Sequence, residues 1–159
     1  MKTITLCLFL LFISSSAFAA EDLETVKQRF IGDWELASYY TFPAVGDARE
    51  MGYIGRLSYD RFGNMAGLGM PKELPERQRD SSERLMQGFA YWGPVSWDLD
   101  RGVVIHHVQG SPMLPQWVGG ENIRYFEFEG EDILKLSLRD SSGRTTGTVS
   151  YTHLRAHET

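Results

Sequence analysis

Two adjacent histidines, His106 and His107, are the side chains of this sequence best suited to proton transfer near neutral pH. They lie in an apolar run, residues 103–109, that is typical of a strand. Successive side chains of a strand point to opposite faces, so the two imidazoles cannot bind one ion together, and we expect no metal site. One histidine should face the interior, either as a hydrogen-bonded structural residue or as a general acid–base. Its candidate partners are Tyr59, Tyr91 and Ser111.

Arg124 is the second residue whose chemistry stands out, because it shares a strand face with Phe126 and Phe128. That face should point inward, and a buried guanidinium without a partner costs several kcal/mol. Two roles are open. Arg124 could lie over Trp34 and close one end of the fold through a cation–π contact. Alternatively, it could anchor the carboxylate of a ligand.

Other classes of protein find little support in the sequence. It contains no G-x-S-x-G elbow, no phosphate-binding Walker loop and no zincin helix, and we expect no cofactor. The net charge is −5 and its acidic and basic residues are interspersed, so nucleic acid is not an expected partner. No segment approaches the roughly 20 apolar residues of a membrane-spanning helix. The oligomeric state is left open.

Short alternating strands separated by turn residues must position these side chains. They are expected over residues 34–42, 55–60, 65–70, 91–99, 103–109, 123–128 and 133–139, with a last strand from Arg144. Helical spacing predicts a short helix over residues 21–30, and Asp80 with Glu83 caps another over residues 80–89. The fold class is therefore all-β, a single antiparallel up-and-down β-barrel of about eight strands. One short helix precedes it and one lies between strands three and four.

Two aromatic residues are expected near the interior of this barrel. Tyr40 shares a face with Trp34 and Leu36, because residues 34–42 alternate cleanly. Trp117 lies in a loop rich in proline and glycine, where it either gates the mouth of a cavity or anchors the loop.

The two ends of the chain are expected to lie outside the barrel domain, residues 20–148. Residues 1–19 combine a positive start, an apolar stretch and a small-residue cleavage site, which predicts a signal peptide and an exported protein, periplasmic or secreted. Cys7 is the only cysteine, so the mature chain has no disulfide. Residues 149–159 back-translate in one frame into a transposase adapter used in sequencing libraries. We therefore expect this tail to be non-native.

Several motifs together resemble the lipocalin-like domain family. Gly32-Asp33-Trp34 is similar to the G-x-W opening of lipocalins. The other motifs are Gly55-Arg56-Leu57-Ser58-Tyr59, Gly63-Asn64-Met65, Phe89-Ala90-Tyr91-Trp92-Gly93, His106-His107-Val108, Ser111, Pro115-Gln116-Trp117-Val118-Gly119, Arg124 and Asp132-Ile133-Leu134-Lys135-Leu136. The resemblance covers nearly the whole mature chain and implies a calycin-type barrel in which Gly32 and Trp34 are structural. Only the end departs from it, because the family closes with a strand resembling L-x-W-x-R.

These observations lead to one expected function and one alternative. We expect an exported lipocalin-like protein that binds a small, largely apolar molecule in the barrel cavity. The alternative is an isomerase or cyclase that uses the same cavity with a His/Tyr acid–base pair. The expected ligand-binding residues are Tyr40, Tyr59, Tyr91, His106, His107, Ser111, Trp117 and Arg124.

Overall fold

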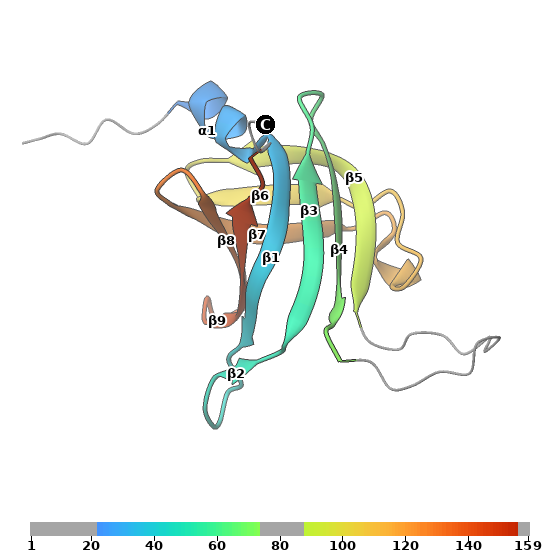
Figure 1. Ribbon diagram of the computed structural model, residues 1–159, viewed down its shortest axis with the longest axis vertical. Helices are drawn as coiled ribbons and strands as arrows, with labels where there is room; N and C mark the ends of the chain where they lie inside the picture. Colours follow the sequence, from blue (N-terminus) through green and yellow to red (C-terminus); the bar gives the residue numbers. More distant parts are fainter. Residues whose placement is uncertain (1–21, 74–87, 156–159) are drawn as a thin grey trace, which may run out of the picture.

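A computed structural model describes residues 22–73 and 88–155 of the chain. Its strands form one antiparallel sheet in the order β2-β1-β3-β4-β5-β6-β7-β8-β9, and an additional pairing of β1 with β9 closes the sheet into a barrel (Figure 1). The strands are β1 (Gly32–Thr41), β2 (Arg49–Glu50), β3 (Tyr53–Tyr59), β4 (Asn64–Pro71), β5 (Phe89–Asp98), β6 (Val103–His107), β7 (Glu121–Glu129), β8 (Ile133–Arg139) and β9 (Thr145–His153). Because β2 has only two residues and pairs with the end of β1, the closed barrel has eight strands, as the sequence predicts.

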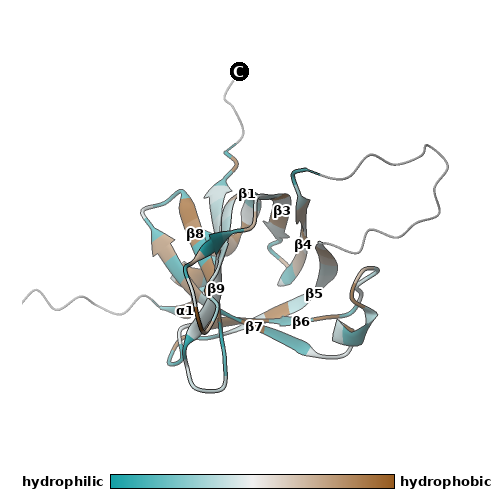
Figure 2. Ribbon diagram, turned by 90° about the horizontal axis from the view of Figure 1, so that it is seen from below, coloured by the Kyte–Doolittle hydropathy of each residue, from teal (hydrophilic) through white to brown (hydrophobic). Residues whose placement is uncertain are grey.

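Alternation along the strands separates a packed interior from a polar surface. Figure 2 shows hydrophobic and hydrophilic residues following one another along the strands, for example in β8. In that strand Leu134 and Leu136 are buried, while Lys135 between them forms an ion pair with Glu129 on the outside. Each strand can therefore line a cavity with one half of its residues.

One end of the barrel is closed by helix α1 (Leu23–Phe30), which confirms the helix expected there. The helix begins at the N-cap Asp22, whose carboxylate accepts a hydrogen bond of 3.0 Å from the backbone N–H of Thr25. Its last residue, Phe30, is fully buried. The Phe30 ring makes edge contacts, at 5.0–5.7 Å between centroids, with Tyr59, Trp97, Phe126 and Phe128. Aromatic rings therefore pack the barrel interior beneath the helix.

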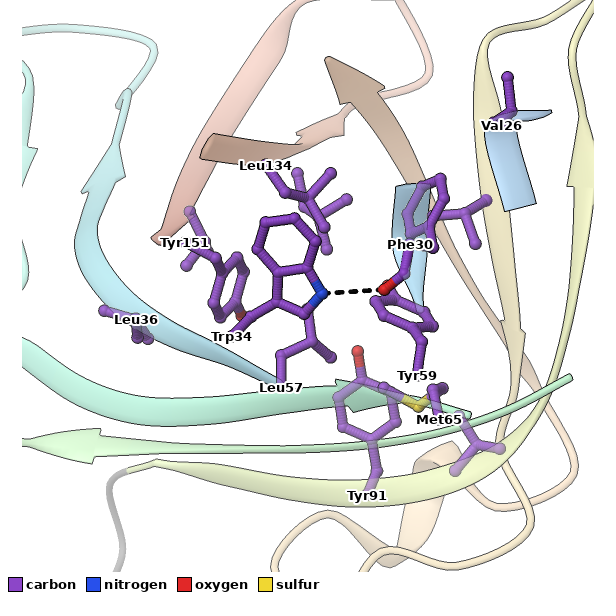
Figure 3. Close-up of a cluster of buried hydrophobic side chains, with 14 residues drawn as sticks. Val26, Phe30, Trp34, Leu36, Leu57, Tyr59, Met65, Tyr91, Leu134 and Tyr151 are labelled. Atoms are coloured by element: carbon purple, nitrogen blue, oxygen red, sulfur yellow. Dashed lines mark hydrogen bonds between the residues drawn. The ribbon is translucent and has the colours of Figure 1, made fainter. Parts of the chain in front are cut away.

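The two residues of the G-x-W opening, Gly32 and Trp34, lie at the start of β1. Trp34 is fully buried, and its Nε1–H donates a hydrogen bond of 2.9 Å to the carbonyl oxygen of Phe30 (Figure 3). Gly32 begins β1 with a backbone φ of 137°, a conformation that residues with a Cβ rarely adopt.

A β-bulge in β1 overturns the expected orientation of Tyr40. Leu36 pairs with Tyr151 of β9 but the next pair is Ser38 with Ser150, so one extra residue is inserted in β1. The insertion reverses the alternation, because side chains in a strand have a period of two. Tyr39 therefore packs inside, while Tyr40 is 38% exposed on the outer face, where its hydroxyl donates to Glu50 at 3.4 Å.

The closing strand β9 continues to His153, so residues 149–153, expected to lie outside the barrel domain, pair with β1 and β8 as part of the barrel. The second predicted helix, residues 80–89, lies outside the described residues except for positions 88 and 89, and Phe89 already belongs to β5. The loop after β6 contains a single 3-10 turn, Pro115–Trp117. In the described ranges, no helix is long and apolar enough to cross a membrane.

Candidate functional site

The end of the barrel opposite α1 contains a cavity of about 140 Å³. Its walls combine aromatic and aliphatic side chains with one cation: they are Tyr39, Phe89, Tyr91, Trp117, Arg124, Leu136, Leu138, Val149 and Tyr151. An apolar pocket with a few convergent polar groups is the usual form of a small-molecule site. A larger hollow, about 460 Å³, lies between α1 and the neighbouring strand ends, but exposed side chains such as Glu24, Asp60 and Arg61 form much of its wall, so it is a surface hollow. We therefore regard the interior cavity as the candidate site.

Arg124 points into this cavity from β7, and it does not close the barrel over Trp34. Its Nη1 donates a hydrogen bond of 2.9 Å to the carbonyl oxygen of Ile123. Among the described residues, no carboxylate lies within ion-pair distance of the Arg124 guanidinium. Near Trp34 the arginine that covers a ring is Arg29, 4.1 Å from the centroid of Phe128. The cavity therefore contains a positive charge that no acidic side chain of the described ranges neutralises.

A second hydrogen-bond donor lies on the same strand face. The side-chain amide of Asn122 is two residues from Arg124, and its buried Nδ2 has no hydrogen-bond partner within the described part of the chain. Most buried side-chain donors have a hydrogen-bond partner, so a buried donor without one requires a physical explanation. The inward face of β7 thus carries, besides the Arg124 guanidinium, an amide N–H group without a partner among the described residues.

His106 is the histidine that faces the interior, and it lies between two tyrosines. Its Nε2 is 2.8 Å from the hydroxyl oxygen of Tyr59, and its Nδ1 is 2.8 Å from that of Tyr91. The imidazole is 1% exposed. Burial, followed by the charge of Arg124, holds the pKa of His106 well below its usual value, so the ring is neutral at pH 7. Burial also raises the pKa of Tyr59 and of Tyr91, and both hydroxyls keep their protons.

Three strands bring this chain of groups together. Tyr59 comes from β3, Tyr91 from β5 and His106 from β6, and Figure 3 shows both tyrosine side chains in the buried cluster. Tyr91 is the member that lines the cavity, whereas His106 and Tyr59 lie behind it. Of these three residues, only Tyr91 is therefore placed to contact a ligand in the cavity.

The other predicted site residues occupy different places. His107 points outward, with its Nε2 2.8 Å from the hydroxyl of Ser96 and its Nδ1 3.4 Å from a carboxylate oxygen of Glu121. Ser111 is buried but lies in the loop, where its hydroxyl donates to the carbonyl oxygen of Ala90 and accepts from the N–H of Leu114. Within the described residues, no cluster of three or more possible metal ligands occurs.

Trp117 does line the cavity, and its ring makes an edge contact of 5.5 Å with Tyr91. Sequence reasoning missed the other hydrophobic walls. Leu136 and Leu138 could have been found from the alternation of β8, which continues to the end of that strand. Tyr39 could not, because only the bulge places it inside.

Comparison with known proteins agrees with this architecture. Residues 31–155 match the family described as the lipocalin-like domain. A search of the curated proteins finds none that matches the chain. Among solved structures, a redesigned β-barrel is similar at a TM-score of 0.45 and 10% identity, over 81% of this chain and 95% of the other. The match over residues 31–155, together with the barrel closed by the pairing of β1 with β9 and the buried Trp34, shows that this chain belongs to the lipocalin-like domain family.

Proposed function

We propose that the protein binds a small, largely apolar ligand bearing a carboxylate in the end cavity, with Arg124 as the anchor of the charged group. The observation that carries this proposal is the guanidinium itself. It lies in an apolar cavity and has no acidic partner among the described residues. An arginine fork matches the two oxygens of a carboxylate, and hydrogen bonds between such charged groups are stronger than neutral ones.

The size of the cavity limits the ligand. An apolar cavity of about 150 Å³ in a protein interior accommodates one benzene molecule. The cavity here is of the same order, about 140 Å³. Its walls include the rings of Tyr39, Phe89 and Trp117, which favour a flat apolar body. A single-ring aromatic or short aliphatic acid is therefore the ligand class with the best fit.

The test compares benzoate with nitrobenzene, which has nearly the same shape but no charge. Isothermal titration calorimetry on the purified protein should show benzoate bound more tightly. In Arg124→Gln, the affinity for benzoate should fall roughly tenfold to a hundredfold, while that for nitrobenzene changes little. Arg56→Gln is the matched control, because Arg56 lies on the outer face with its side chain 52% exposed.

Either comparison, between the two probes or between Arg124→Gln and the unaltered protein, can contradict the proposal. Equal affinity of the two probes for the unaltered protein, or unchanged benzoate binding by Arg124→Gln, would show that the guanidinium is not an anchor. Circular dichroism of each variant separates a binding defect from loss of the fold. Mass spectrometry of molecules that co-purify with the protein then identifies the natural ligand.

An isomerase or cyclase that uses a His/Tyr pair has weaker support. Such a reaction needs a proton acceptor at the ligand, and His106 is separated from the cavity by Tyr91. Conversion of a co-purified ligand by the purified protein, lost in His106→Gln, would favour this second function.

We also propose that residues 1–19 direct export to the periplasm or out of the cell. The support is the sequence pattern of that segment alone. The intact mass of the protein recovered from its native host should correspond to a chain that begins at Ala20.

A further inference from the structure

The hydrogen bonds of His106 constrain the direction in which the Tyr91 hydroxyl points. Both ring nitrogens are engaged, Nε2 with Tyr59 and Nδ1 with Tyr91, each at 2.8 Å. A neutral imidazole has one N–H donor and one acceptor nitrogen. One tyrosine must therefore donate to the ring while the other accepts from it.

Two arrangements satisfy this rule. In the first, the Tyr91 O–H donates to Nδ1, and Nε2–H donates to the Tyr59 oxygen. In the second, the Tyr59 O–H donates to Nε2, and Nδ1–H donates to the Tyr91 oxygen. Only the second leaves the Tyr91 O–H free for another acceptor. Each of the three groups holds one proton in both arrangements, so no proton is gained or lost between them.

We infer that Tyr59 and His106 are positioning residues that make the Tyr91 hydroxyl a second donor, beside Arg124, to the carboxylate of the ligand. This inference rests on the proposed function. In the bound state the hydrogen bonds run from Tyr59 to His106, from His106 to Tyr91 and from Tyr91 to the ligand. The specificity for a carboxylate then comes from two side chains of the cavity wall, Arg124 and Tyr91. Tyr91 is oriented by the hydrogen-bonded pair behind it.

Two features of the structure and one electrostatic argument support the inference. Tyr91 and Arg124 both line the cavity, so one anion can contact both. The Arg124 side chain is close enough to Tyr91 to lower the pKa of its hydroxyl by charge and hydrogen bonding, although burial raises it more. An anion at Arg124 also repels the lone pairs of the Tyr91 oxygen unless its O–H points toward the anion, which favours the second arrangement.

His106 is suited to this role because it remains neutral. The groups around it that carry or can carry charge are Arg124, His107, Tyr59 and Tyr91. A protonated ring would donate from both nitrogens and could no longer accept from Tyr59. The nearby positive charge of Arg124 and the burial of the ring both oppose that state.

The decisive prediction concerns Tyr59, which does not line the cavity. Removing its hydroxyl in Tyr59→Phe takes away the donor that supports the second arrangement. Affinity for benzoate should fall roughly three- to tenfold in Tyr59→Phe and by a similar factor in Tyr91→Phe. Affinity for nitrobenzene should change less than twofold in both. Tyr53→Phe is the matched control: it lies on the same strand and packs on Tyr39 but takes no part in the hydrogen-bonded chain.

The tautomer can also be observed directly in the unaltered protein. Nitrogen-15 NMR of the His106 ring, assigned by comparison with His106→Gln, should show Nδ1 protonated and Nε2 unprotonated in the benzoate complex. This measurement does not depend on whether Tyr59→Phe folds.

The outcomes separate this inference from the proposed function. Benzoate binding that requires Arg124, with equal losses for benzoate and nitrobenzene in Tyr59→Phe, would overturn the inference and leave the proposed function standing. An Nε2–H tautomer in the benzoate complex would overturn it too. Failure of the unaltered protein to prefer benzoate over nitrobenzene would remove both.

Discussion

The indole Nε1–H of Trp34 donates a 2.9 Å hydrogen bond to the carbonyl oxygen of Phe30. The contact joins the first strand of the barrel to the last turn of the helix that closes it (Figure 3). It also satisfies a polar atom in a region that is otherwise aromatic, where an unpaired donor would be costly. The closed end and the cavity end of the barrel are thus built differently: one is packed by rings, and the other keeps a charged group and open volume.

Replacing Phe30 tests how much the helix contributes to stability. Phe30→Ala removes a fully buried ring and its four aromatic contacts, so the free energy of unfolding should fall by about 3–5 kcal/mol. Urea denaturation followed by tryptophan fluorescence measures the change. Leu23 lies in the same helix but is 39% exposed, so Leu23→Ala should change the free energy of unfolding by only about 0.5 kcal/mol. Equal effects of the two substitutions would show that the helix does not close the barrel.

The buried imidazole of His106 predicts a dependence of stability on pH. Its folded-state pKa lies well below the value of 6.5 taken for an unperturbed histidine. The unfolded chain therefore binds a proton that the folded protein does not, once the pH falls below about 6.5. Stability from this residue is complete above that pH and decreases as the pH falls toward the folded-state pKa, by up to about 1.4 kcal/mol per pH unit.

Denaturation curves between about pH 5 and 7 test this dependence. His106→Gln should be less stable than the unaltered protein at pH 7, but its stability should change less with pH over this range. His107→Gln serves as the control, because that ring is on the outer face and 40% exposed. If the stability of His106→Gln depends on pH as steeply as that of the unaltered protein, other groups cause the dependence. The carboxylates of Asp60 and Asp140, whose pKa is lowered by hydrogen bonds to Asn64 and Ser142 respectively, lose their contributions only below about pH 4.

The bulge in β1 makes opposite predictions for two adjacent tyrosines. Tyr39→Ala removes a ring from the wall of the cavity, which should destabilise the protein by roughly 1–3 kcal/mol and enlarge the cavity. Tyr40→Ala alters the outer face and should change stability by only about 0.5 kcal/mol. Binding of a larger acid such as 2-naphthoate should improve in Tyr39→Ala alone. The reverse order of effects would place Tyr40 inside and refute the bulge.

The residues expected to be non-native, 149–159, make a prediction about the natural gene. Val149 and Tyr151 face the interior from β9, paired with Tyr39 and Leu36 of β1. We predict that the natural coding sequence departs from this one after Thr148 and that it encodes apolar or aromatic residues at positions 149 and 151, because the closing strand must bury them. Long-read sequencing of the locus tests both parts. A natural reading frame through Thr159 would contradict the first, and polar residues at the two positions would contradict the second.

The sequence by itself determined the strands, the closing helix and the inward face of β7. Each of these follows from local alternation or helical spacing, which depend on neighbouring residues only. The inward orientation of Arg124, on one face with Phe126 and Phe128, could be predicted in this way. Its role could not, because local alternation does not tell whether the side chain reaches Trp34 at one end of the barrel or the cavity at the other.

Only the tertiary structure decided which histidine faces inward and what it contacts. The adjacent residues His106 and His107 are equivalent in an alternating pattern, and the pairing of β6 with β5 and β7 selects His106 for the interior. Its two tyrosine partners come from β3 and β5, far apart in the chain, so no local pattern predicts the contact. Likewise, one extra residue in β1 exchanged Tyr40 for Tyr39, since a single insertion reverses every side chain that follows it.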